Sequence, residues 1–239
     1  MPETLFISDL HLDKERPEII QLFSLFLRSQ ATLSESLYIL GDLFEYWIGD
    51  DQPLTGLEPV IESLQSLTAA SVPVYFIHGN RDFLIGESFA TTTGITLLPE
   101  STVIEVYGRP ALIMHGDTLC TDDTDYQKMR GMLRHADWQR QFLSLSLEER
   151  TQQALQLRQK SLSATKDKKE NIMDVNPQTV EKIMLDNNVD LLIHGHTHRP
   201  AIHELSIQNQ KAQRIVLGDW YSQGSVLRMS PDSLELISI

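Results

Sequence analysis

Five short polar motifs, each placed directly after a short apolar run, constrain the fold of this chain more than any other feature. The runs are rich in aliphatic, aromatic and β-branched residues, as buried strands are, and they cover 4–7, 37–40, 74–77, 111–114 and 191–193. The motifs that follow them are Asp9-Leu10-His11, Gly41-Asp42, Gly79-Asn80-Arg81-Asp82, His115-Gly116-Asp117 and His194-Gly195-His196-Thr197-His198. Polar side chains at the carboxyl ends of buried strands are how an α/β sheet builds a site along one edge. The sequence therefore predicts an α/β fold.

The stretches between these runs indicate helices and further strands. Apolar residues recur at helical spacing over 17–29 and 57–70, which is typical of β-α-β units around a parallel or mixed sheet. A hairpin is predicted over 103–114 with its turn at 107–110, and a helix over 177–186 begins at a proline. Further strands are predicted over 190–193, 202–207, 214–217 and 225–229.

The segment 121–170 differs from the rest of the chain. It contains ten Lys or Arg and eight Asp or Glu, whereas the whole chain has a formal net charge of -13. Its apolar residues lie at helical spacing, so we predict a single domain over 1–239 that carries 121–170 as a helical insertion. Because the insertion begins soon after His115, one interpretation is a cap over an amphiphilic anionic ligand. The alternative is a helical pair packed on the core with solvated charges.

Composition limits the partners and the compartment. The excess of acidic residues argues against non-specific binding to nucleic acid. The single cysteine, Cys120, has no intramolecular disulfide partner, which favours a reducing compartment, and we expect it to be a small core residue rather than a nucleophile. The N-terminus lacks the regions of a signal peptide, and no apolar run approaches the ~20 residues of a spanning helix. A soluble or peripheral protein is expected.

The motifs together offer the nitrogen and oxygen ligands that divalent transition metals prefer. The candidate ligands are Asp9, His11, Asp42, Asn80, His115, His196 and His198. Side chains alternate along an extended strand, so we expect Asp9 to share a face with His11, and His196 with His198. A carboxylate at Asp42 is placed to bridge two ions about 3.5–4 Å apart.

Other polar residues near the motifs have different predicted roles. Arg81 suits phosphate because its planar guanidinium makes two parallel hydrogen bonds. His78 and His194 are expected to be structural or to support the ligands, and no role is predicted for His135 and His203. Each motif alone is weak, since Gly-Asp and Gly-Asn are most often turns. The joint pattern carries the prediction of a two-metal hydrolase.

The order D-x-H, G-D, G-N-R-D, H-G-D and G-H-T-H resembles the calcineurin-like metallophosphoesterase superfamily. The phrases FISDLHL, LYILGDLFEYWIGDD, YFIHGNRDFL, LIMHGDTLCTDD, IMDVN and LIHGHTHRP extend over nearly the whole chain. Within the superfamily they resemble the UDP-2,3-diacylglucosamine pyrophosphohydrolases of lipid A biosynthesis. This resemblance implies a four-layered α/β/β/α sandwich with a helical cap. It also implies hydrolysis of the pyrophosphate of UDP-2,3-diacylglucosamine to UMP and 2,3-diacylglucosamine 1-phosphate (lipid X).

The resemblance further implies a cofactor, a set of site residues and a location. Two Mn²⁺ ions per subunit are implied, one held by Asp9, His11, Asp42 and His198, the other by Asp42, Asn80, His115 and His196. The implied catalytic residues are Asp42, Asn80, Arg81, His115 and His196. The implied substrate contacts are Asn80, Arg81, Asp123, Ser161, Thr165, Lys168 and His196, with Thr165 a shorter side chain than the Asn of the family. Peripheral association with the cytoplasmic side of the bacterial inner membrane is implied, with a lipid-linked nucleotide sugar as partner and no protein partner.

Two other functions use the same fold. A metallophosphoesterase acting on small soluble phosphodiesters or on phosphoproteins would share the metal ligands and differ in the segment 121–170. A non-enzymatic scaffold would keep the fold for protein binding. The scaffold is disfavoured because all seven ligand positions carry residues competent to bind metal.

Overall fold

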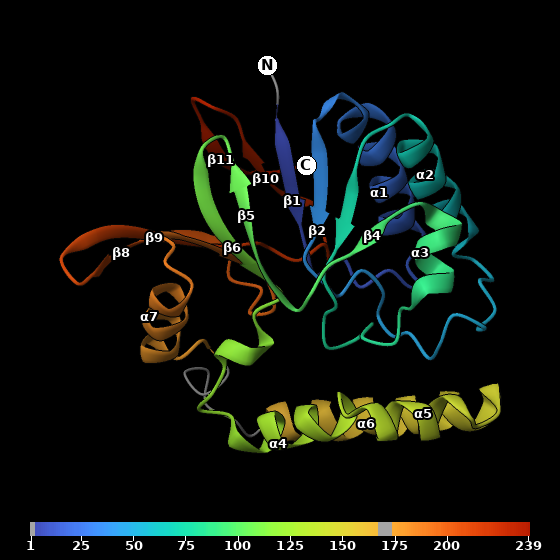
Figure 1. Ribbon diagram of the computed structural model, residues 1–239. Helices are drawn as coiled ribbons and strands as arrows, with labels where there is room; N and C mark the ends of the chain where they lie inside the picture. The colour runs from blue at the N-terminus through green and yellow to red at the C-terminus, as the bar shows by residue number, and fades with distance from the viewer. Residues whose placement is uncertain (1–2, 167–173) are drawn as a thin grey trace.

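The computed structural model describes residues 3–166 and 174–239, with the side chains of 160–166 left out of the description. Two sheets form its centre (Figure 1). The six-stranded sheet contains, in spatial order, β11 (Leu234–Ser238), β10 (Ser225–Met229), β1 (Thr4–Ile7), β2 (Ser36–Ile39), β3 (Val74–Phe76) and β4 (Thr96–Leu97). The five-stranded sheet contains β5 (Ser101–Val106), β6 (Arg109–Met114), β7 (Leu191–His194), β9 (Gln210–Val216) and β8 (Ala201–Ile207).

The strands that precede the polar motifs run parallel within each sheet. In the first sheet β1, β2, β3 and β4 are parallel neighbours, and in the second β6 is parallel to β7 and β7 to β9. The antiparallel strands β10, β11, β5 and β8 complete the two sheets. The carboxyl ends of β1, β2 and β3 therefore lie along one edge, which is the lower edge in Figure 1.

Helices cover the outer faces of the two sheets (Figure 1). The first sheet is covered by α1 (Pro17–Ser29), α2 (Glu58–Ala69) and α3 (Glu87–Thr93). Helix α7 (Pro177–Asp186) packs on the second sheet, where its Val180 and Met184 join a buried cluster with Leu192. Two single turns of 3₁₀ helix also occur. The first, η1 (Ala31–Leu33), lies between α1 and β2, and the second, η2 (Asp117–Leu119), follows β6.

Alternation along the buried strands produces three apolar layers. Leu5 and Ile7 pack toward the helices of the first sheet, whereas Phe6 between them faces the second sheet and joins a cluster with Ile113 and Ile193. Side chains of successive strand residues point to opposite faces, so strands apolar at every position are buried on both sides. The order is helices, sheet, sheet and helix.

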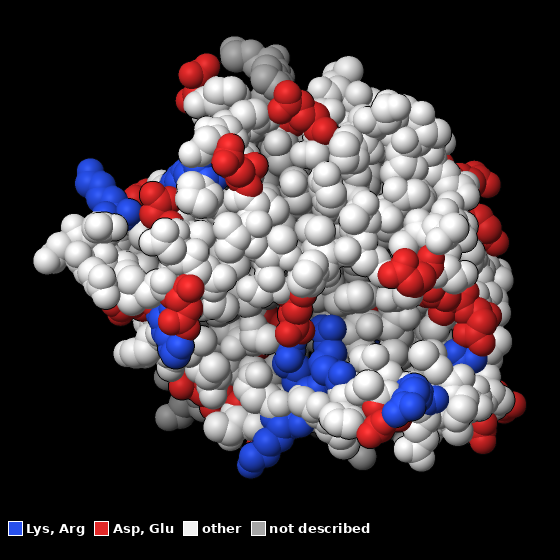
Figure 2. Space-filling view, viewed as in Figure 1, with Lys and Arg blue, Asp and Glu red and all other residues white. Residues whose placement is uncertain are grey.

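Within 121–166, the part of this segment that the structure describes, three helices lie below the lower edge of the sheets (Figure 1). They are α4 (Thr124–Leu133), α5 (Ala136–Leu143) and α6 (Leu147–Lys166). On the face shown in Figure 2, Lys and Arg side chains gather in this lower part of the molecule. Within the residues that the structure describes, no helix combines the length and apolar character needed to cross a bilayer.

The sequence predicted most of the α-helices and strands that the structure describes and missed three, besides the two 3₁₀ turns η1 and η2. Helices over 17–29 and 177–186 and the strand over 225–229 have the predicted bounds. The missed elements are α3, β4 and β11. Helix α3 has seven residues, three of them threonine, and β4 has two residues, so neither offers enough positions for a periodic pattern. Their conformation is set by packing on neighbouring elements.

The predicted core position of Cys120 is confirmed, and it leads to a chemical prediction. The side chain is buried, and burial, with a contribution from Asp117, raises the pKa of the thiol to about 12. At pH 8 the folded protein therefore keeps this thiol protonated, and only the thiolate is reactive. We expect Ellman's reagent to react at least about a thousand-fold more slowly with the folded protein than with protein unfolded in urea. Equal reaction rates for folded and unfolded protein would contradict the burial of the Cys120 thiol.

Candidate metal centre

The seven candidate ligands lie together where the carboxyl ends of the strands meet. Two groups have ligand atoms within 4.8 Å of one another, namely Asp9, His11 and His198, and Asp9, Asp42 and His115. Asn80 joins the second group, since its Oδ1 lies 2.9 Å from Nε2 of His115. The ring of His196 lies edge-on to that of His115, with 5.0 Å between centroids. Residues from both sheets thus form one cluster.

The backbone at the ligands differs from the extended conformation that the sequence predicted. Strand β1 ends at Ile7 and β7 at His194, before the ligands begin. The ligands with left-handed backbone are Asp9 (φ 55°), His11 (φ 50°), Asp42 (φ 52°), His196 (φ 69°) and His198 (φ 54°). The expectation that alternation along a strand aligns these side chains was therefore wrong. Non-glycine residues in this conformation cost of order 1–3 kcal/mol each, and such strain concentrates at functional sites.

Glycines let the ligand loops approach one another closely. A Cβ on Gly41, whose φ is +85°, would lie 2.5 Å from the Gly79 backbone. A Cβ on Gly195 would lie 2.2 Å from Oδ2 of Asp9 and 2.2 Å from Oγ of Ser8. Side chains at these positions would push the ligands apart.

The close approach at Gly195 gives a prediction for Gly195→Ala. The added methyl group displaces the Asp9 carboxylate, so we expect cation affinity to fall by at least about tenfold, the scale seen when ligand-supporting contacts are lost. Isothermal titration with Mn²⁺ measures the change. Gly131→Ala is the control, because a Cβ there meets nothing within 4 Å. Unchanged affinity in Gly195→Ala would show that the Asp9 carboxylate does not bind a cation.

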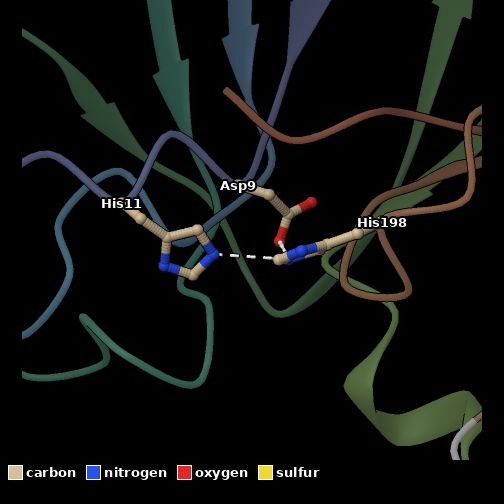
Figure 3. Close-up of side chains that lie close together, drawn as sticks. All are labelled: Asp9, His11 and His198. Carbon is tan, nitrogen blue, oxygen red and sulfur yellow. Dashed lines mark hydrogen bonds and ion pairs between the residues drawn. The ribbon is translucent and has the colours of Figure 1, made fainter. Parts of the chain in front are cut away.

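The first group converges on one point (Figure 3). Nε2 of His11 and Nε2 of His198 face each other at 3.3 Å, and Oδ1 of Asp9 lies 3.4 Å from Nε2 of His198. Oδ2 of Asp9 accepts hydrogen bonds from the Ser8 hydroxyl and the His196 backbone N–H, at 2.6 and 2.9 Å. Oδ1 of Asp9 is buried and accepts no hydrogen bond from the residues that the structure describes. A buried carboxylate oxygen without a hydrogen bond is costly, and a cation would satisfy it.

The second group centres on His115. Its Nδ1 lies 2.9 Å from the carbonyl oxygen of Leu40, which only accepts, so Nδ1 carries a proton and donates it. Nε2 of His115 then faces Oδ1 of Asn80 at 2.9 Å and Oδ1 of Asp42 at 3.7 Å. Acceptors that face each other repel unless a proton or a cation lies between them. This donor set therefore fits a divalent cation.

The electrostatics of the ion-free cluster agree with this fit. Burial would lower the pKa of His115, but the carboxylates of Asp42 and Asp9 outweigh it and raise that pKa to about 9. Burial would raise the pKa of Asp9, but the close imidazole of His198 and the charges of His115 and His11 lower it well below its usual value. Burial and His115 lower the pKa of His196 to about 4. Without an ion, protonation of His115 offsets the buried negative charge.

Asp82 supports the ligand loops, a role that the sequence analysis missed. This buried carboxylate accepts hydrogen bonds from the backbone N–H groups of Gly79 at 2.9 Å and Leu43 at 2.7 Å. It therefore joins the loop of Asp42 to the loop of Asn80. Burial and the charge of Asp42 raise the pKa of Asp82 to about 6. Its place at the end of the Gly79–Asp82 motif was the available signal.

Helix α4 is attached to the same loops. The Tyr126 hydroxyl and Nε of Arg130 both donate to Oδ2 of Asp117, at 3.0 and 2.7 Å. Nη2 of Arg134 donates to the carbonyl of Gly79 at 2.8 Å. Asp117 and Gly79 belong to motifs that carry ligands, so the helical segment is fixed directly to the cluster.

The remaining predicted site residues have varied positions. Arg81 donates its backbone N–H to Oδ1 of Asp42 at 2.8 Å. Asp123 caps α4 by accepting from the backbone N–H of Tyr126 at 3.1 Å. Lys168 and the side chains of Ser161 and Thr165 lie outside the described residues.

The four other histidines lie outside the ligand cluster. His78 and His194 hydrogen-bond backbone carbonyls, as expected of structural residues. His135 accepts from the backbone N–H of Asp137 at the start of α5, and burial lowers the pKa of His203.

A pocket lies between the ligand loops and the helices α4, α5 and α6, and residues of both line it. It encloses about 960 Å³ of empty space, part of which is open to solvent. Asn80 and Arg81 line it together with arginines of the helical segment, Arg130, Arg134 and Arg158. Its apolar lining includes Trp47, Phe83, Met129, Leu133, Trp138, Phe142, Leu155 and Leu157. The pocket thus joins a cationic region at the ligand loops to an apolar region under the helices.

Comparison with known proteins identifies the family. The family model described as calcineurin-like phosphoesterase matches residues 3–200. The UDP-2,3-diacylglucosamine hydrolase of Serratia proteamaculans (strain 568) is 51% identical over 234 residues, which cover 98% of each chain. The protein of the same name from Cellvibrio japonicus (strain Ueda107) is 52% identical over 233 residues, covering 98% of this chain and 97% of that one. The chain therefore belongs to the calcineurin-like phosphoesterase family.

Proposed function

We propose that this chain hydrolyses the pyrophosphate bond of UDP-2,3-diacylglucosamine, releasing UMP and 2,3-diacylglucosamine 1-phosphate in lipid A biosynthesis. The observation that carries the proposal is the pocket, in which Asn80 and Arg81 share one space with the apolar faces of α4, α5 and α6. A substrate that joins a pyrophosphate to two acyl chains needs both surfaces side by side. Relatives that cover the chain almost completely bear the name of this activity.

The cofactor in this proposal is a pair of divalent cations, and we propose Mn²⁺. One ion would be held by Asp9, His11, Asp42 and His198, the other by Asp42, Asn80, His115 and His196. The buried free oxygen of Asp9 and the facing acceptors around His115 support this assignment. Such ions supply an acidified water and positive charge for the phosphoryl oxygens.

The residues of the chain bind and orient the phosphates. Arg81, whose side chain is 24% exposed, presents its guanidinium to the pocket and pairs with a phosphoryl oxygen as charge develops there. His196 is half-buried, and desolvation together with the charge of His115 keeps its pKa low, so its ring stays neutral at pH 7, the form that would bind a cation. Asn80 brings an uncharged oxygen beside Arg81. These side chains fix one phosphorus near Asp42.

The helical segment binds the lipid part of the substrate. Trp138 and Phe142 stack at 4.9 Å between ring centroids and offer an aromatic surface to acyl chains. Each CH₂ buried there contributes roughly 0.8 kcal/mol. We propose Asp123, Ser161, Thr165 and Lys168 as further contacts to the substrate, from the family resemblance. We propose that the protein associates peripherally with the cytoplasmic side of the inner membrane, where an acylated substrate would be accessible.

The test is release of UMP by the purified protein loaded with Mn²⁺. UDP-2,3-diacylglucosamine is compared with a UDP-sugar that lacks acyl chains, each with and without excess EDTA. The proposal predicts rapid release from the acylated compound, little from the other and none with EDTA. Equal turnover of both compounds would favour a phosphoesterase of small soluble substrates, and the apolar lining of the pocket argues against that alternative.

A further inference from the structure

Two carboxylates stand behind the imidazoles that face each other in the first ligand group. Oε2 of Glu45 lies 3.2 Å from Nδ1 of His11. Oδ2 of Asp219 lies 3.5 Å from Nδ1 of His198. Each ring therefore points Nε2 toward the other ring, as Figure 3 shows, and has a carboxylate within ion-pair distance of Nδ1. Among the described residues Nδ1 of His11 makes no hydrogen bond, so Glu45 is the acceptor nearest to an otherwise unsatisfied buried nitrogen. His11 with Glu45 and His198 with Asp219 therefore form two similar pairs, one on each side of the facing Nε2 atoms.

The second ligand group is supported differently. Nδ1 of His115 donates to the carbonyl oxygen of Leu40, a neutral acceptor. An anionic acceptor raises the basicity of the opposite ring nitrogen more than a neutral one does. The two proposed ion sites thus differ in the charge of the groups behind their imidazoles.

Both carboxylates are held by partners of their own. Oε1 of Glu45, which is buried, lies 2.8 Å from Nη2 of Arg158 on α6. Oδ1 of Asp219 accepts from the backbone N–H of Tyr221 at 3.1 Å. The Tyr221 ring stacks on the His11 ring at 5.4 Å, with 3° between their planes. Neither carboxylate is free to turn away from its imidazole without losing these contacts.

We propose that Glu45 and Asp219 are paired positioning residues that keep His11 and His198 protonated on Nδ1 and direct Nε2 of both rings to one cation. The proposal rests on the two-cation site of the proposed function. A carboxylate that accepts from Nδ1–H fixes the tautomer and ring orientation, and loss of such a partner typically lowers metal affinity 10- to 100-fold. Glu45 and Asp219 consequently set the affinity of one ion site and leave the other unchanged.

The test is titration of metal-free full-length protein with Mn²⁺ alone, with free Mn²⁺ followed by electron paramagnetic resonance. We expect the wild type to bind two equivalents. Glu45→Gln and Asp219→Asn should each weaken one equivalent about 10- to 100-fold and leave the other within about twofold. Asp190→Asn is the matched control, because Asp190 pairs with Arg109 and lies at the opposite end of β7. It should bind both equivalents as the wild type does.

A second measurement separates positioning from a structural defect. The visible spectrum of Co²⁺-loaded protein reports ligand geometry, and we expect it to change in both variants for the weakened equivalent only. Asp219, whose side chain is 26% exposed, is the position where substitution disturbs the core least. Wild-type affinity at both equivalents, or equal weakening of both, would overturn the inference. The metal titrations contain no substrate, so they test this inference independently of the UMP assay. If the wild type binds two equivalents but releases no UMP, only the proposed function is overturned.

Discussion

Asp42→Ala is expected to lower kcat/KM for UMP release by at least about a thousand-fold, which corresponds to about 4 kcal/mol of transition-state stabilisation. Oδ2 of Asp42 lies 3.8 Å from Nε2 of His11, and Oδ1 lies 3.7 Å from Nε2 of His115. Its carboxylate thus stands between the two ligand groups. Removing it takes one negative charge from both proposed ion sites and releases the backbone N–H of Arg81.

Asp42→Asn separates the charge from the shape of the side chain. It retains an oxygen for the Arg81 N–H, so a loss similar to that of Asp42→Ala would assign the effect to charge. Mn²⁺ titration should show at least one equivalent lost in both variants, and circular dichroism should show the wild-type fold. Near-normal turnover with two ions bound would contradict the bridging role of Asp42.

Trp138→Gln is expected to raise KM for UDP-2,3-diacylglucosamine about 100-fold, or about 2.7 kcal/mol. Trp138 lines the pocket and stacks on Phe142, so its loss removes a large apolar surface from the proposed acyl site. An amide in its place leaves polar groups against an acyl chain. Turnover of bis(4-nitrophenyl) phosphate, which has no acyl chain, should change less than about threefold.

Leu143→Gln provides the control on the same helix. Leu143 is 42% exposed and does not line the pocket, so its replacement should leave both substrates unaffected. Equal losses on the two substrates in Trp138→Gln would show that the variant disturbs the phosphoryl site rather than lipid binding.

Apolar runs in the sequence predicted the strands correctly because each sheet is buried between two apolar layers. Alternation at Leu5, Phe6 and Ile7 sends side chains to two different buried layers, so an uninterrupted apolar run was a reliable sign of a strand covered on both faces. The helix at 177–186 was likewise marked by a proline at its first position. Short elements such as β4 depend on neighbours and leave no such pattern.

The candidate site was predicted in composition but not in detail. Because all the motifs follow parallel strands, their clustering at one edge followed from topology. The left-handed backbone at Asp9 and His198 did not, since isolated residues adopt it only under tertiary constraint. Glu45 and Asp219 lie outside the motifs and gain a role only through contacts with His11 and His198. The pocket depends on how α4, α5 and α6 dock, which spacing does not specify.

The most direct measurement is an anomalous difference map from crystals of this protein grown with Mn²⁺. We expect two peaks, one bounded by Asp9, His11 and His198, the other by Asn80, His115 and His196, with Asp42 contacting both. A map with no peak among these residues, or with a single peak that Asp42 does not contact, would contradict the two-cation centre.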